Sequence, residues 1–587
     1  GITCVMKSIV AAVIYKVFPK SRKRFAERWP DLKAKALQTG IIPLITSIFC
    51  QTGDAKFHPS EEVYMKPIKS ILSFILAAIL AVTCMVAFQG CGSDKAAKSV
   101  KTLTFASSDI KTLNAVLNTH DELPSLIFSG LMKHDGHGMP VLDLASKYDF
   151  DEASLTYTFH LRDNVTWHDG KPFTADDVKF TLDTLRFNKD IESETADSYK
   201  NIKDVEVVDP KTVKIHLSKP SAAMLDSLCI GMLPKHLLDG KNIMTDSFNQ
   251  NPVGTGRYKF VSWDKGQSII LTRNDKFYGK MPKIEKIVCK IIPDENAKAA
   301  QLKSGGIDFS LINEKDAAAF RDNKDFKVFN FKTADFRAIG PNFKAPYWQN
   351  PEHKALIPVL GYALDKKAIV DSVLTGRGVP AYSPIQLNKE YNDESVDHRD
   401  YNPELFKKRM AELGWTLGSD GIYEKNGEKL SFSVDAREFE IERVDMAKIA
   451  SAQFKKLGVD MKVNVVPKFD WKNMQCVLIG QAAPFDPDQG TYDYFVTGAS
   501  ANYTHYSNPA VDAALEAGRS SYDKATRKAA YNTFQKAWNE QPAFIMLAYL
   551  EGTYVGNKKI TGPSVETVLG HHAAGVFWNI EDWDISE

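Results

Sequence analysis

Features that would point to several common protein classes are scarce in this sequence. The 587 residues carry 74 Lys and Arg against 73 Asp and Glu, a net charge of +1, so no basic excess suggests a nucleic-acid partner. Seven cysteines are too few for a disulfide-built scaffold. No fixed-period repeat or low-complexity linker occurs. With 44% apolar residues and this length, we expect two or three globular lobes joined by chain crossings.

Catalytic and metal-binding motifs are also missing. No HExxH helix, GxSxG elbow or GxxxxGK[ST] phosphate loop is present, and no carboxylate pair can be assigned acid and base roles. The His-Asp-Gly-His run at residues 134–137 is typical of a surface turn, and we expect His571 and His572 to be solvated. The sequence therefore predicts a protein without enzymatic activity, cofactor or metal site.

Near its beginning, the sequence contains a segment with the features of an export signal. Residues 65–69 are basic, residues 71–87 are almost wholly apolar, and Gly90 precedes Cys91. This order resembles a lipoprotein signal, in which Cys91 is acylated after cleavage. A plain signal or an uncleaved anchor is the alternative, because about 17 apolar residues can span a bilayer. Residues 1–64 then have two explanations, a gene start placed upstream of a true start at Met65 or a genuine cytoplasmic extension.

Residues 167–180, Trp-His-Asp-Gly-Lys-Pro-Phe-Thr-Ala-Asp-Asp-Val-Lys-Phe, combine a strand end, a turn and a helix start. Apolar residues alternate with polar ones over residues 155–161, as in a half-buried strand. Gly170 suits the turn because glycine adopts a positive φ without steric cost. Thr174 stands at a helix N-cap position, and Asp176 and Asp177 follow it in the first helical turn. We therefore predict a strand, a tight turn and an amphipathic helix in succession.

Four later segments accompany this stretch. Residues 251–260 contain Gly254-Thr255-Gly256, which we interpret as a tight backbone turn because no third glycine and no helix follow. The others are GYALDKKAIVDSVLTGRGVPA at 361–381, YNPELFKKRMAELGW at 401–415 and Tyr-Ser-Asn-Pro-Ala-Val-Asp at 506–512. Together with residues 167–180, these segments resemble the extracytoplasmic solute-binding proteins of family 5, which serve peptide and nickel ABC importers. The resemblance covers about residues 100–587.

The resemblance implies an α/β, two-lobed fold like that of class II periplasmic binding proteins, with an extra subdomain in the first lobe. Helices and strands alternate after about residue 340, which predicts a largely parallel, helix-covered sheet in the second lobe. The expected division, after the signal at 65–91, is a first lobe from residues 92–134, 255–333 and 553–587, its subdomain at 135–254, and a second lobe at 334–552.

The family relationship also implies a ligand cleft between the lobes, which close over a solute and deliver it to permease subunits. In peptide-binding relatives an Asp pairs with the ligand ammonium, and in dipeptide binders an Arg pairs with the carboxylate. Such pairing matters because a buried unpaired charge costs several kcal/mol. We expect a monomer on the outer face of the membrane, held there by the lipid on Cys91.

Individual binding residues follow from matching positions. Arg437 stands where dipeptide binders place the carboxylate-binding Arg, and Phe439 where they place an aromatic residue. At the ammonium site Gln481 replaces Trp and Pro484 replaces Asp, so Asp486 is the candidate substitute, although its equivalent in relatives looks structural. Arg337 is a further candidate cation for an anionic ligand.

Several hypotheses stay open on the sequence alone. A peptide receptor is the first, and a receptor for a metal chelate or modified peptide is the second, which the change at Pro484 favours. A secreted enzyme is disfavoured because no catalytic motif is present, and a signalling or structural lipoprotein that has lost transport is the last. Whether two of Cys229, Cys289 and Cys476 form a disulfide also stays open.

Overall fold

The structure, a computed structural model, describes residues 99–119, 121–191, 196–482 and 484–586. The signal-like segment and Cys91 lie outside these ranges, so the lipidation prediction is not addressed by the coordinates. Within the described part of the chain, Cys229, Cys289 and Cys476 are free thiols.

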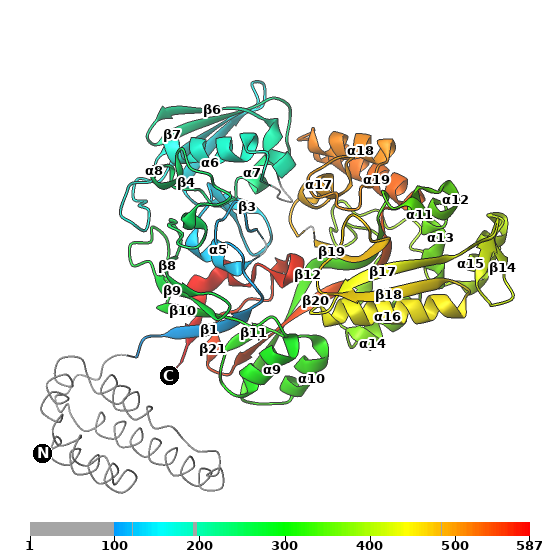
Figure 1. Ribbon diagram of the computed structural model, residues 1–587. Helices are drawn as coiled ribbons and strands as arrows, with labels where there is room; N and C mark the ends of the chain where they lie inside the picture. The colour runs from blue at the N-terminus through cyan, green and yellow to red at the C-terminus, as the bar shows by residue number, and fades with distance from the viewer. Residues whose placement is uncertain (1–98, 120, 192–195, 483, 587) are drawn as a thin grey trace, which may run out of the picture. The chain divides into compact units, whose positions relative to one another are not determined.

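The first lobe is built on strands with one buried face. Strand β1 (Thr102–Ser107) pairs in parallel with β10 (Lys286–Ile291), which continues antiparallel into β9 (Ser268–Arg273) and β8 (Tyr258–Asp264). Alternate residues of β10 are buried, as the period of two requires. Helices α9 (Glu295–Lys303) and α10 (Glu314–Arg321) follow this sheet and lie below β11 (Phe309–Leu311) in Figure 1.

A four-stranded antiparallel sheet forms a separate layer of the first lobe. Its order is β4 (Ala145–Asp151), β5 (Thr156–Leu161), β7 (Thr212–Leu217) and β6 (Ile202–Asp209), and α6 (Ala175–Phe187) packs on it. The predicted strand, turn and helix around residues 167–180 are therefore confirmed, with Gly170 at φ 90° in the turn.

Two of the sequence motifs meet beside this layer. The backbone N–H of His168 donates to Gly254 O at 2.9 Å, and the His168 ring bonds Gly254 N at 3.2 Å and Gly256 O at 3.0 Å. A Cβ on Gly254 would stand 1.9 Å from Ile127 O, so the glycine permits close packing of two chain segments. Neither Gly254 nor Gly256 has a positive φ, although the chain bends at residues 255–257, so close packing is what requires glycine here.

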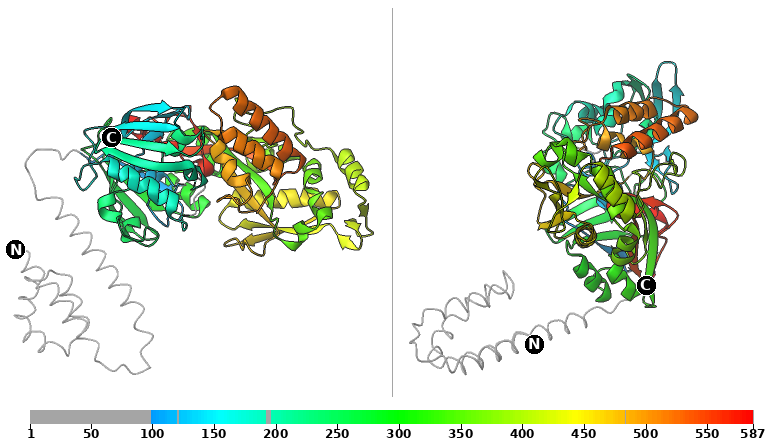
Figure 2. Two further views of the ribbon diagram at one scale, coloured as in Figure 1. Left: turned by 90° about the horizontal axis from the view of Figure 1, so that it is seen from above. Right: turned by 90° about the vertical axis from the view of Figure 1, so that its right-hand side faces the viewer.

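The second lobe has a mixed sheet instead of the predicted largely parallel one. Strand β17 (Ser431–Arg437) pairs in parallel with β18 (Asp460–Val466) and β19 (Cys476–Ala482), but β19 runs antiparallel to β12 (Phe326–Pro341). Helix α16 (Ile441–Lys456) lies along β17 and β18 in Figure 1. Helices α18 (Pro509–Arg519) and α19 (Lys524–Glu540) pack on each other, as the orange ribbons of Figure 2 show.

Strands β12 and β20 (Ile545–Asn557) join the two lobes within one sheet. Phe326 to Lys332 pair with the end of β20 in the first lobe, and the pairing resumes at Phe336 with Tyr549 in the second. Between these stretches Thr333, Ala334 and Asp335 face only Leu550 of β20, which is a β-bulge. Because the chain passes between lobes at this irregular point, it is the natural position for bending.

The lobes touch each other at several points on either side of these strands. Lys315 of α10 pairs with Asp445 of α16 at 2.5 Å, and Lys219 pairs with Glu516 of α18 at 2.5 Å. The ring of His134 stacks on Phe485 with centroids 3.5 Å apart. The described conformation therefore has the lobes in contact.

The C-terminal segment returns to the first lobe and completes its core. Phe577 packs edge-on against Phe105 of β1, with ring centroids 5.0 Å apart. Trp583, fully buried, packs against Phe309 of β11 at the same separation. Aromatic pairs of this kind contribute beyond their buried area, so the last residues are part of the lobe's core.

Candidate functional site

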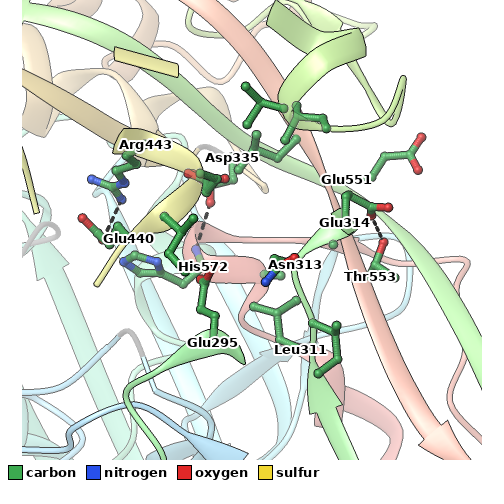
Figure 3. Close-up of a pocket in the computed structure, with 18 of the residues that line it drawn as sticks. Glu295, Leu311, Asn313, Glu314, Asp335, Glu440, Arg443, Glu551, Thr553 and His572 are labelled. Atoms are coloured by element: carbon green, nitrogen blue, oxygen red, sulfur yellow. Dashed lines mark hydrogen bonds and ion pairs between the residues drawn. The ribbon is translucent and has the colours of Figure 1, made fainter. Parts of the chain in front are cut away.

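A pocket lies beside the bulge of β12, between residues of both lobes (Figure 3). It encloses about 120 Å³ and opens to solvent. The first lobe contributes α9, α10 and the segment at His572, and the second lobe contributes the start of α16. Charged side chains from both lobes therefore face a common space.

Asp335, in the bulge itself, links the site to the C-terminal segment. It is 1% exposed and accepts hydrogen bonds from Arg337 Nη1 at 2.7 Å, His571 Nδ1 at 2.9 Å and the backbone N–H of His572 at 3.0 Å. Burial alone would raise the pKa of Asp335, but Arg337 and His571 outweigh it and hold the pKa well below its usual range. Asp335 is thus a fixed anion at the crossing between lobes.

Arg337, one of the predicted cations, does line this pocket. Its donors are engaged by protein carboxylates, Nη1 by Asp335 at 2.7 Å and Nε by Glu442 Oε1 at 2.6 Å. A ligand anion would have to compete with two carboxylates for it, so the role of Arg337 as a direct ligand contact remains a prediction.

Three cationic or titratable side chains converge on one glycine of β19. A Cβ at Gly480 would stand 2.5 Å from Arg337 Nη1, 2.8 Å from Arg443 Nη2 and 3.0 Å from His571 Cε1. A glycine here lets these groups approach the strand where any larger residue would push them away. Sequence reasoning did not identify Gly480, Asp335 or Arg443, because no local pattern signals which side chains of β12, β19 and α16 meet.

Only one of the two histidines differs from our expectation of solvated side chains: His571 is largely buried, whereas His572 is exposed as expected. His571 is only 15% exposed and is bonded to Asp335. His572 opens into the pocket and has φ 53°, a left-handed conformation that is rare for a residue with a side chain. Desolvation, with the charges of His571 and Arg443, lowers the pKa of His572 well below its usual value. His572 therefore presents a neutral imidazole to the pocket.

Glu295 is the acidic group of the first lobe nearest to the charges of α16. Burial, and secondarily the charge of Glu442, raise the pKa of Glu295 to about 7. Its buried Oε2 has no hydrogen-bond partner among the described residues. The facing carboxylates of the two lobes therefore repel one another at neutral pH unless a proton or a cation intervenes.

Arg437 and Phe439 lie away from this pocket, at the end of β17. The guanidinium of Arg437 is 41% exposed, donates to both oxygens of Glu440 at 2.8 and 3.0 Å, and stands 5.3 Å from the ring centre of Phe469. Phe439 is 53% exposed. The two residues share a surface edge of the second lobe, so their ligand-binding role stays a prediction.

Asp486 is occupied by a partner in its own lobe. Its two oxygens accept hydrogen bonds from Arg527 at 2.7 and 2.8 Å, and Oδ1 also accepts from Asp488 N at 3.0 Å. This arrangement agrees with the structural role of its equivalents in relatives. Gln481, at the position where relatives have Trp, is buried, and its Oε1 has no partner among the described residues.

The described residues show no arrangement of three or more His, Cys, Asp or Glu side chains suited to holding a metal ion. In the same part of the chain no helix is both long and apolar enough to cross a membrane.

Comparisons with known proteins relate this fold and pocket to characterised relatives. Residues 139–515 match the family described as Bacterial extracellular solute-binding proteins, family 5 Middle. Protein XP55 of Streptomyces lividans is 29% identical over 504 residues, 83% of this chain and 91% of that protein.

Two solved structures share the fold over nearly their whole length. NikZ from Campylobacter jejuni, in complex with Ni(L-His), has a TM-score of 0.78 and 36% identity over 82% of this chain and 99% of its own. The oligopeptide-binding protein AppA from Bacillus subtilis, in complex with a nonapeptide, has a TM-score of 0.74 and 28% identity over 83% and 99%. The two-lobed α/β fold expected from the sequence is thereby confirmed. With a family match over more than half of its length, the chain belongs to the bacterial extracellular solute-binding proteins of family 5.

Proposed function

We propose that this protein is the extracytoplasmic substrate-binding component of an ABC importer, and that its lobes close over a peptide and deliver it unaltered to the permease. The observation that carries the proposal is the passage of β12 and β20 between two lobes through a bulge, with a polar pocket beside it. Family membership and the similarity to AppA support the class of protein and the peptide ligand.

Recognition of a peptide requires partners for its terminal charges. Arg437 is the proposed contact for the carboxylate, on the basis of its position in the family pattern, with Phe439 against a neighbouring side chain of the ligand. The ammonium has no equivalent partner at Pro484, and Asp486 is engaged by Arg527. The free amino group of a peptide would therefore have to meet a different acid, such as Glu295.

A metal chelate is the second candidate ligand. NikZ, crystallised with Ni(L-His), is 36% identical to this chain. The loss of the ammonium-binding Asp at Pro484 also fits a ligand other than a free peptide, and the neutral imidazole of His572 is a group that can coordinate a transition metal. A chelate brings most of its own metal ligands, so one protein imidazole could complete its coordination.

Binding to the purified full chain distinguishes these candidates. A ligand that binds only the folded state increases the free energy of unfolding by mass action, by about 2.7 kcal/mol at a ligand concentration of a hundred times Kd. The melting temperature rises as a result. We expect a shift with peptides of two to nine residues and none with Ni(II) and L-histidine if the first proposal holds. A shift only with the nickel complex would replace it by the second candidate. Chemical turnover of any bound solute would contradict both.

We also propose that the protein works as a monomer anchored through lipid on Cys91. Globomycin, which blocks lipoprotein signal cleavage, should then cause the precursor to accumulate, and Cys91→Ser should abolish labelling with radioactive palmitate. Labelling that persists in Cys91→Ser would contradict the anchor.

A further inference from the structure

Arg443 has donor groups that the protein itself leaves unused. It is the third residue of α16, is 3% exposed and lines the pocket between the lobes. Nη1 donates to Leu478 O at 3.3 Å, but neither Nε nor Nη2 has a hydrogen-bond partner among the described residues. A buried guanidinium with unpaired donors is costly, and such groups in a native protein call for an explanation.

Two other arginines of the second lobe show what normally occupies this edge of a guanidinium. Arg519 donates Nε and Nη2 to the two oxygens of Asp488 at 2.8 and 2.9 Å. Arg437 donates the same two nitrogens to Glu440 at 3.0 and 2.8 Å. The Nε–Nη2 edge matches the spacing of a carboxylate, which makes these paired contacts both strong and specific.

The nearest carboxylate does not fill this edge of Arg443. Glu440 Oε1 lies 3.4 Å from Arg443 Nη2, but both oxygens of Glu440 are already bonded to Arg437. Glu442, the next candidate, is directed to Arg337 Nε at 2.6 Å. Each acid beside Arg443 is therefore hydrogen-bonded to another arginine, and Figure 3 shows Glu440 only as an ion-pair neighbour of Arg443.

The surroundings keep Arg443 charged, and its one ion-pair partner, Glu440, is shared with Arg437. Burial, and then the neighbouring charge of Arg337, lower the pKa of Arg443 to about 10, so it remains a cation at neutral pH. The missing partner is therefore a planar anion that can reach a pocket between the lobes.

We infer that the Nε–Nη2 edge of Arg443 binds a carboxylate of the transported solute. The inference deepens the proposed function and rests on it, since it specifies the solutes as carboxylate-bearing. The C-terminus of a peptide and the amino-acid part of a metal chelate both provide such a group, so the contact applies to either source. It also places the carboxylate deep between the lobes, where closure would shield the pair from water and strengthen it.

Matched pairs of ligands test this contact in the full chain. The probes are Ala-Ala-Ala against Ala-Ala-Ala-amide, and Ni(II) with L-histidine against Ni(II) with L-histidinamide, measured by isothermal titration calorimetry. The wild-type protein should prefer the acid over the amide in one of the two pairs by about thirty-fold or more, as expected for a desolvated charge pair. Arg443→Gln should abolish this preference. Arg409→Gln, on the exposed face of α15 (Pro403–Glu412), is the matched control and should retain it.

Two results in this experiment would overturn the inference. One is an acid preference in Arg443→Gln equal to that of the wild type. The other is loss of the preference in Arg437→Gln with retention in Arg443→Gln, which would place the carboxylate at the position that the family pattern indicates.

A ligand-free measurement decides the point separately from the proposed function. If Arg443 serves a ligand, Arg443→Met removes an unpaired buried charge, so the melting temperature should stay at or above that of the wild type. Arg519→Met should lower it by several degrees, because Asp488 is left buried and unpaired. A decrease in Arg443→Met as large as that in Arg519→Met would show that Arg443 is structural and would refute the inference. If neither probe pair binds the wild type, the proposed ligands fail, and this comparison still tests Arg443.

Discussion

The corner at residues 167–180 and the pocket wall at the start of α16 differ in how far their buried charged groups are hydrogen-bonded by the protein. In the corner, the carboxylate of Asp177 accepts hydrogen bonds from Trp167 Nε1 at 3.1 Å, Thr174 N at 3.0 Å and Lys235 N at 2.9 Å. In the wall, Nε and Nη2 of Arg443 have no hydrogen-bond partner among the described residues, and only Nη2 has a carboxylate, Glu440, in ion-pair range at 3.4 Å. Both regions are polar and buried, and only the corner is complete without a ligand. The difference teaches that saturation of hydrogen bonds, more than burial or motif strength, separates structural polar residues from binding residues.

The largest expected effect on stability is in the corner at residues 167–180, where the hydrogen bonds of the buried carboxylate are all made by the protein. Asp177→Ala leaves one buried and two partly buried donors without an acceptor, so we expect the free energy of unfolding to fall by about 3–5 kcal/mol. Urea unfolding followed by tryptophan fluorescence measures this loss. Asp176→Ala, the exposed neighbour on the same helix turn, is the control and should change stability by less than about 0.5 kcal/mol. A loss of under about 1 kcal/mol in Asp177→Ala would mean that the corner is not the rigid structural unit described here.

A smaller, pH-dependent effect on stability is expected from Glu295 in the pocket between the lobes. The pKa of Glu295 is about 7 in the folded protein and near 4.5 when unfolded, so the folded state binds this proton more tightly. Its contribution to stability is fully present below pH 4.5 and is lost as the pH rises through about 7. Relative to Glu295→Gln, the wild type should therefore lose about 1 kcal/mol between these pH values, after allowance for screening by water.

Melting temperatures recorded at intervals from pH 4 to pH 8 check this difference. Glu122, whose pKa burial also raises to about 7, titrates in both proteins and cancels from the comparison. Glu404→Gln, on an exposed side chain, is the control and should follow the wild type. Parallel curves for the wild type and Glu295→Gln would show that the facing acids do not repel each other as the geometry indicates.

The smallest effect concerns the ion pair that joins the lobes near the pocket. Lys315 is 57% exposed and Asp445 is 27% exposed, so Lys315→Ala should cost only about 0.2–1 kcal/mol. The change in melting temperature should shrink further in 0.5 M NaCl because salt screens exposed charges. An effect that is large and independent of salt would indicate that this pair, and not the bulge region, controls contact between the lobes.

Local signals in the sequence were sufficient for most of the fold. The alternation at residues 155–161 and the cap at Thr174 predicted β5 and α6. The second-lobe sheet was predicted less well, because the order of helices and strands does not show that β12 and β20 return antiparallel to β19 and β12. Such pairings join residues about 135–230 positions apart, and no local pattern encodes them.

The candidate site was less accessible to sequence reasoning. Arg337 was identified as a cation and does reach the pocket, but its pairing with Asp335 and Glu442 depends on a bulge in β12 and on how α16 packs against β17 and β18. Arg443 gave no signal, since a basic residue in the first turn of a helix is usually solvated. His571 was misjudged as solvated because the segment that carries it folds back onto Asp335 from a distant part of the chain.

The position of Phe577 and Trp583 has a consequence for how the protein is made. Both rings fill the interior of the first lobe against β1 and β11, which are translated hundreds of residues earlier. That interior cannot be completed while the nascent chain is still growing, since domains assemble as units once their parts have emerged. Because the first lobe cannot fold completely before its C-terminal residues are made, the chain stays unfolded until synthesis ends. An unfolded chain of this kind can still pass through a translocation channel.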